Sequence, residues 1–74
     1  MSAPRDTRAP LDQLTPREAE IVELLALGLS NKEISARLGI AINTIRAHCV
    51  NAFEKMGVHN RTAAAIAHVK RKSP

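Results

Sequence analysis

Three glycines divide this chain into short segments: Gly28, Gly39 and Gly57. Each glycine follows a run of apolar residues with helical spacing. Glycine adopts the left-handed backbone that commonly ends a helix. The segments are rich in Leu, Ile, Val and Ala, with Phe53 as the single aromatic residue, and this composition favours helices over strands. The sequence therefore predicts an all-α fold built from short helices.

Local capping signals predict where these helices begin. Thr15 and Ser30 are each followed three residues later by a glutamate, Glu18 and Glu33, which is the pattern of a capping box. In the first helix, Glu18 and Glu20 then have a local role near the helix start, where negative charge is favoured, and we prefer this role to a catalytic one. Asn60 is the expected cap of the last helix. We expect four helices, at about residues 16–27, 31–38, 42–56 and 61–72.

The third of these segments has two different sides. One side carries a stripe that the spacing predicts to be buried, with Phe53 beside it: Ile45, Cys49, Ala52 and Met56. The other side carries a mixed set of residues: Asn43, Arg46, Ala47, Val50 and Glu54. The segment begins after Ala41, which has no side-chain oxygen to cap a helix. The short link 38–41 joins it to the preceding helix, as in a helix-turn-helix.

In the other helices, the predicted inward residues are those on the apolar side. In the first helix they are Ile21, Val22, Leu24, Leu25 and Leu27. In the second helix they are Ile34 and Leu38, and in the fourth they are Ala64, Ala65, Ile66 and Val69. Four helices joined by short turns that contain glycine predict one compact all-α domain.

The whole chain of 74 residues is short enough for one small domain. Cys49 is the single cysteine, so an internal disulfide is excluded and a reducing compartment is expected. Residues 1–13 show no periodicity and are expected to form a disordered or loosely docked arm. They lack the apolar run of a secretory signal, and no segment is long enough to cross a bilayer, so we expect a soluble, cytoplasmic protein without a membrane partner.

Charge is distributed unevenly along the chain. Residues 1–29 contain three arginines and five acidic residues, a net charge of −2. Residues 30–74 contain eight lysines or arginines and two glutamates, a net charge of +6. A basic half of this kind favours a polyanionic partner, with nucleic acid ahead of an anionic membrane, although it is also compatible with an ordinary solvated face.

Residues 14–65 contain several short motifs in sequence: L-T-P-R-E, G-L-S-N-K-E-I, L-G-I followed by T-I-R-A-H, and K-M-G-V followed by N-R-T. Together these resemble the LuxR/GerE-type helix-turn-helix domain of bacterial transcription regulators. The resemblance implies a four-helix DNA-binding domain over residues 14–74, with its helix-turn-helix at about 31–50. It also implies that the third helix reads the major groove of double-stranded DNA.

By position, the resemblance implies two sets of DNA contacts. Arg46, Ala47 and Val50 correspond to residues that face base edges, and three others to residues that contact phosphates: Lys32, Asn43 and Thr44. Two departures from the family pattern bear on this site. Ala41 stands where the family usually has Ser or Thr, and Val50 stands where many relatives carry a polar or basic residue. Arg46 is then the one strong base reader.

The fourth helix often mediates dimerisation in this family. Here the dimerisation candidates are Ala63, Ile66, Ala67 and Lys70, because small side chains permit close approach of a second helix. We expect a weak homodimer that forms mainly on DNA, since the basic residues 70–72 would repel their own copy. The alternative is that the alanines reflect high helix propensity on a solvated face.

Other functions find little support in the sequence. His48 and Cys49 are adjacent on a helix and point about 100° apart, so they are poorly placed to chelate one metal ion. No nucleophile lies beside a base, and no glycine loop suits a phosphate, so we expect neither a cofactor nor an enzyme. Two hypotheses remain. The first is a nucleoid-associated DNA-binding regulator, and the second is a protein-interaction module that keeps the fold, has weak DNA affinity and pairs with a related regulator. RNA polymerase is a further candidate partner of the first.

The sequence leaves open whether the protein is a stand-alone regulator or the output domain of a larger response regulator. Met1 favours the stand-alone form.

Overall fold

The computed structural model describes residues 14–72, with the side chains of 71 and 72 left aside, and the predicted arm at 1–13 lies outside these residues. Four helices follow one another, and no strand occurs in the part of the chain described: α1 (Pro16–Ala26), α2 (Asn31–Leu38), α3 (Ile42–Met56) and α4 (Arg61–Lys72). Three of the four predicted helices have the expected bounds. The all-α prediction is confirmed.

The helix starts follow the predicted capping signals. At α1 the Thr15 hydroxyl accepts from the Glu18 N–H at 3.1 Å, and the Glu18 carboxylate accepts from the Thr15 N–H at 3.0 Å. Ser30 and Glu33 make the same reciprocal pair at α2. The Asn60 side chain accepts from the Ala63 N–H at 2.8 Å at the start of α4.

The first helix is one residue shorter than predicted. Helix α1 ends at Ala26, and Leu27 is its C-terminal cap, with the side chain 71% exposed instead of buried. The prediction that Leu27 continues the apolar face was wrong, because the chain turns there toward Gly28, whose φ is 100°. Helix α3 ends as expected at Gly57, with a φ of 72°, and the Val58 N–H donates to the Phe53 carbonyl.

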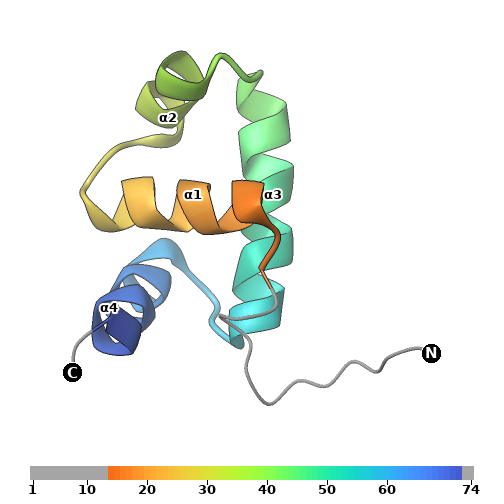
Figure 1. The fold of residues 1–74 in the computed structure, drawn as a ribbon. Helices are drawn as coiled ribbons and strands as arrows, with labels where there is room; N and C mark the ends of the chain where they lie inside the picture. Colours follow the sequence, from red (N-terminus) through yellow and green to blue (C-terminus); the bar gives the residue numbers. More distant parts are fainter. Residues whose placement is uncertain (1–13, 73–74) are drawn as a thin grey trace.

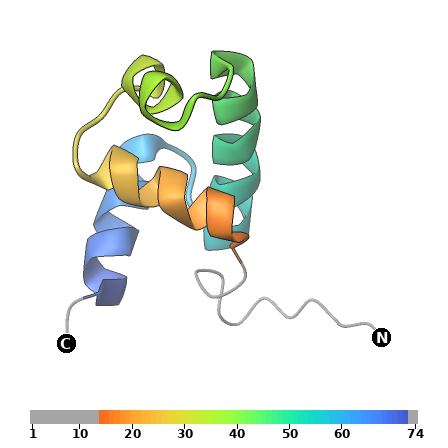
Figure 2. The ribbon, with the colours of Figure 1, turned by 45° about the horizontal axis from the view of Figure 1, so that its top comes forward.

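The four helices pack around one small core. Helix α1 lies between α3 and α4 and packs against both, while α2 packs mainly against α3, as Figures 1 and 2 show from two directions. The core side chains come from all four helices: Ile21, Val22, Leu24, Leu25, Ile34, Ile45, Cys49, Ala52, Met56 and Ala64. The predicted stripe of α3 is therefore buried, and Phe53 packs half-buried beside it.

The apolar side predicted for α4 is only partly correct. Ala64 is fully buried and Ala65 is half-buried, but Ile66 is 52% exposed and Val69 is 55% exposed. Helix α4 packs mainly on α1, and this contact needs a single narrow face of small residues. The two larger residues therefore remain on the surface.

Candidate nucleic-acid interface

Helix α3 presents a continuous exposed face opposite its buried stripe. Its exposed residues are spaced at intervals of three and four along the helix: Asn43, Arg46, Ala47, Val50 and Glu54. Ile45 and Ala52 on the other side are fully buried against the core. Because the buried stripe fixes the rotation of α3, the same five outward residues always share one surface.

The start of α3 has backbone groups without a capping side chain. Ala41 makes no side-chain cap, as predicted, and its carbonyl accepts from the N–H groups of Thr44 and Ile45, both at 3.0 Å. Within the described residues, no hydrogen bond reaches the N–H groups of Ile42 and Asn43. These groups carry the positive end of the helix dipole, so the start of α3 suits a negatively charged partner.

The turn between α2 and α3 is held by hydrogen bonds to Ser35. Gly39 adopts the left-handed conformation with a φ of 69°, and its N–H donates to the Ser35 carbonyl at 2.9 Å. The Ser35 hydroxyl donates to the carbonyl of Ile40 on the far side of the turn. These bonds fix α2 against the start of α3, where Thr44 is exposed, and Lys32 is exposed on the first turn of α2.

The exposed surface of this helix pair therefore includes Lys32 in the first turn of α2, Thr44 in the first turn of α3, and the outer face of α3. The sequence model described as "Bacterial regulatory proteins, luxR family" matches residues 12–68, which is most of the chain. The chain belongs to the LuxR family.

Individual LuxR-family relatives agree with this assignment. The chain is 47% identical over 60 residues to the "Probable transcriptional regulatory protein SgaR" of Hyphomicrobium methylovorum, covering 81% of this chain and 28% of SgaR. It is 42% identical over 60 residues to the nitrate/nitrite response regulator protein NarL of Escherichia coli, covering 81% of this chain and 28% of NarL. The chain thus spans little more than a quarter of the length of these relatives.

A solved structure supports the same LuxR-type fold. The response regulator ChrA, from a heme-sensing two component system, aligns with 97% of this chain at a TM-score of 0.79 and 39% identity. The alignment covers 33% of the ChrA chain. The four-helix arrangement of this LuxR-family domain therefore matches one part of a larger regulator.

Arg61 holds the LuxR-family domain together in a way that sequence reasoning missed. From the start of α4, its guanidinium donates to the Leu29 carbonyl and to the Asn31 side-chain oxygen, the latter at 3.4 Å. The Cys49 thiol lies 4.0 Å from the same Asn31 oxygen. Burial raises the pKa of the Cys49 thiol, and the nearby Arg61 charge offsets part of that rise. Arg61 thus connects α4 to the start of α2, where Asn31 also contacts Cys49 of α3.

A second interaction that the sequence did not reveal joins the start of α1 to the end of α3. Glu18 is 4% exposed, and its carboxylate accepts from the Lys55 ammonium at 2.7 Å. Burial alone would raise the pKa of Glu18, but the bonds from Lys55 and Thr15 together lower it below its usual value of 4.5. The sequence predicted only the capping role of Glu18, and the structure confirms this role and adds the ion pair with Lys55.

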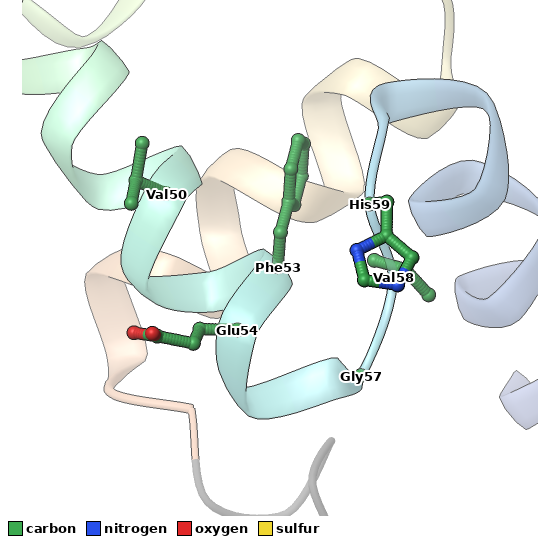
Figure 3. Close-up of a pocket in the computed structure, with 6 residues that line it drawn as sticks. All are labelled: Val50, Phe53, Glu54, Gly57, Val58 and His59. Atoms are coloured by element: carbon green, nitrogen blue, oxygen red, sulfur yellow. The ribbon is translucent and has the colours of Figure 1, made fainter.

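An open groove of about 430 Å³ continues the exposed face of α3 toward its C-terminal end. Figure 3 shows Val50, Phe53 and Glu54 on α3, with Val58 and His59 on the segment after the helix.

Among the described side chains, no three His, Cys, Asp or Glu residues are grouped closely enough to hold a metal ion. Nor is any described helix long and apolar enough to cross a membrane.

Proposed function

We propose that this chain is the DNA-binding output domain of a LuxR-family transcription regulator and that it inserts α3 into the major groove of duplex DNA. The observation that carries the proposal is the exposed face of α3. This face points outward because the buried stripe on the opposite side fixes the orientation of α3 about its own axis. A major groove about 12 Å wide admits one α-helix. The names of SgaR and NarL as regulators support the same role.

The proposed contacts divide into base reading and phosphate binding. Arg46 is exposed, and no hydrogen bond or ion pair with a described residue occupies it, so its guanidinium is available for the two acceptors of guanine. Ala47 and Val50 face the base edges beside it. Lys32, Asn43 and Thr44, with the free N–H groups at the start of α3, bind phosphates.

The proposal is tested by removing one positive charge at a time. Arg46→Ala should cost about 1–3 kcal/mol on a duplex selected by the wild type and should relax its base preference. Lys32→Ala should weaken all sequences about equally and flatten the salt dependence by about one unit of slope. Fluorescence anisotropy on selected and random-sequence duplexes, over a range of salt concentrations, measures both effects.

Arg17→Ala is the matched control for charge. Arg17 is exposed on α1, where it pairs with Glu20 at 3.1 Å, outside the proposed interface. It should change affinity little for either duplex. If Arg46→Ala and Arg17→Ala behaved alike, the placement of α3 in the groove would be wrong. If the wild type bound no duplex at any salt concentration, the alternative of a protein-interaction module would replace DNA binding.

We further propose that two copies pair through α4, mainly on DNA. The supporting observation is the exposed side chain of Ile66 beside an open apolar groove of about 230 Å³, which also involves Ala65, Val69 and Lys70. The pairing surface consists of the four predicted dimerisation candidates: Ala63, Ile66, Ala67 and Lys70. Two copies related by a two-fold axis would read half-sites about 34 Å apart.

We propose that the domain acts without catalysis, on the nucleoid in the cytoplasm, and that RNA polymerase is a partner of the complete regulator. The regulatory names of the relatives support this setting.

A further inference from the structure

We infer that Val50 reads the methyl group of thymine, so that the domain selects a site with a thymine within one or two base pairs of the guanine bound by Arg46. This inference rests on the proposed function and adds to it a chemical class of target site.

The starting observation is the exposure of Val50. Its side chain is 63% exposed, and among the described residues it is the one large apolar side chain that α3 presents to solvent. It lies four residues after Arg46 and three after Ala47, so the three share one helix face. An arginine and two apolar side chains therefore form the central part of the exposed surface.

The chemistry of valine limits what it can recognise. An isopropyl group has no donor or acceptor, so it can neither bind a phosphate nor hydrogen-bond to a base edge. In the major groove, thymine is the one standard base that presents a methyl group, and apolar side chains contact it. Contact with that methyl group removes apolar surface of both partners from water, which is favourable.

The neighbourhood of Val50 favours a base edge over the phosphate backbone. Glu54, one turn further along α3, is exposed and repels a phosphate at this end of the helix. Phe53 and Val58 line the groove beside Val50 and extend its apolar surface, and Glu54 and His59 are the polar residues of the lining (Figure 3). An uncharged, apolar group of the partner therefore fits next to Val50.

Helix geometry sets the position of the methyl group. Four residues advance about 6 Å along an α-helix, and base pairs on one strand are spaced by about 3.4 Å. A methyl group under Val50 then lies one or two base pairs from the base edge under Arg46.

The experiment uses the chain itself and duplexes that differ by methyl groups alone. Sites are first selected from random-sequence duplexes containing thymine. The best selected duplex is then synthesised with each thymine in turn replaced by deoxyuridine, which removes the 5-methyl group and keeps the base pairing. Affinities are measured by anisotropy for the wild type, for Val50→Ala and for the control Leu27→Ala.

We expect at least one thymine, one or two base pairs from the essential guanine, whose replacement weakens wild-type binding about fourfold, the ratio expected for one buried methyl group. With Val50→Ala the same replacement should have little effect. Leu27→Ala removes an isopropyl group from the loop after α1, where the side chain is 71% exposed and lies outside both the face of α3 and the proposed pairing surface. The ratio of its affinities for the thymine and deoxyuridine duplexes should equal that of the wild type.

The inference is overturned if no deoxyuridine replacement next to the guanine matters, or if Val50→Ala keeps the full effect. In either case, binding that still depends on Arg46 and on salt would leave the proposed function intact. If no duplex were enriched and no salt-dependent binding occurred, the proposed function would fail together with the inference. Circular dichroism verifies that each variant is folded.

Discussion

Glu18 has a negative charge almost completely buried beneath the surface of α1, and it is held there by two different partners. It caps the Thr15 N–H at 3.0 Å and pairs with Lys55 at 2.7 Å. The Lys55 side chain is 35% exposed, so its ammonium group keeps part of its hydration. The pair therefore stabilises the contact between α1 and α3 without removing two full charges from water.

The pKa of Glu18 predicts how this pair responds to acid. Its pKa is lower in the folded chain than its usual value, so the stabilisation is complete above the unfolded pKa, near 4.5, and is lost as the pH falls through the lower folded value. Glu18→Gln should cost about 1–2 kcal/mol at neutral pH, because the amide keeps the cap but loses the charge. In acid, wild type and variant should converge. Urea unfolding followed by circular dichroism at several pH values measures this.

Glu20→Gln provides the matched comparison. Glu20 is an exposed carboxylate whose pair with Arg17 is open to solvent, and such pairs contribute little. The unfolding free energy of the Glu20→Gln variant should equal that of the wild type at every pH. An acid response that Glu18→Gln left unchanged would show that other carboxylates control acid unfolding.

At the scale of one element, the start of α3 combines low stability with the proposed phosphate contact. Helix α3 begins without a side-chain cap, whereas α1 and α2 both begin with complete capping boxes. Because its N–H groups are not occupied by a side chain, they remain available to a ligand. The helix that we propose reads DNA is thus the one whose start is least satisfied by the protein itself.

Adding a cap at position 41 separates these two properties. Ala41→Ser should raise the unfolding free energy by up to about 1 kcal/mol, because its hydroxyl can accept from an N–H at the start of α3. Ala41→Asp should stabilise the fold to a similar extent through the cap and the helix dipole. It should weaken DNA binding, however, since its carboxylate would lie beside the proposed phosphate.

Chemical unfolding and anisotropy on the same variants test both statements. A serine variant no more stable than the wild type would indicate that another group already caps α3. Equal DNA affinity of the serine and aspartate variants would argue against a phosphate at this position.

The elements themselves were largely predictable, because their signals are local. Thr15 and Ser30 each act on a residue three positions away, and Gly39 and Gly57 act on the turn in which they lie. Contacts between distant residues gave no such signal. Lys55 contacts Glu18, 37 positions away in the sequence, and Arg61 contacts Leu29, 32 positions away. The sequence around a lysine or an arginine does not indicate which distant residue it will contact.

The exposed side of α4 could not be predicted for a related reason. A helical period identifies an apolar face, but the width of the contact with α1 decides how much of that face is covered. Here the contact covers Ala64 and leaves Ile66 and Val69 largely exposed. The residues that we propose to contact DNA were identified through the family resemblance, and those on α3, including Arg46 and Val50, are exposed as this proposal requires.

At the scale of the whole molecule, α4 determines whether two copies can act together. Ile66→Asp places a charge on the exposed side of α4 and should prevent pairing on a duplex with two half-sites, while the single domain stays folded. Ala67→Glu should have the same effect, although Ala67 is half-buried and packs against the core, so its folding needs to be verified.

Sedimentation of each variant with a palindromic duplex measures the number of copies bound. Leu27→Asp is the control, since Leu27 is 71% exposed on the loop after α1 and outside the proposed pairing surface. The wild type and this control should bind as two copies, and the α4 variants as one. A one-to-one complex for the wild type would remove α4 from the proposed assembly.

The single thiol of the chain also makes opening of the molecule chemically measurable. Cys49 lies on the buried side of α3, is 7% exposed and has a raised pKa, so little reactive thiolate meets a solvent-borne reagent while the helices stay packed. Alkylation must then wait for α3 to separate from its neighbours, and each molecule can be labelled once. The labelling rate therefore follows the population of opened molecules. A DNA duplex that holds α3 closed should slow it.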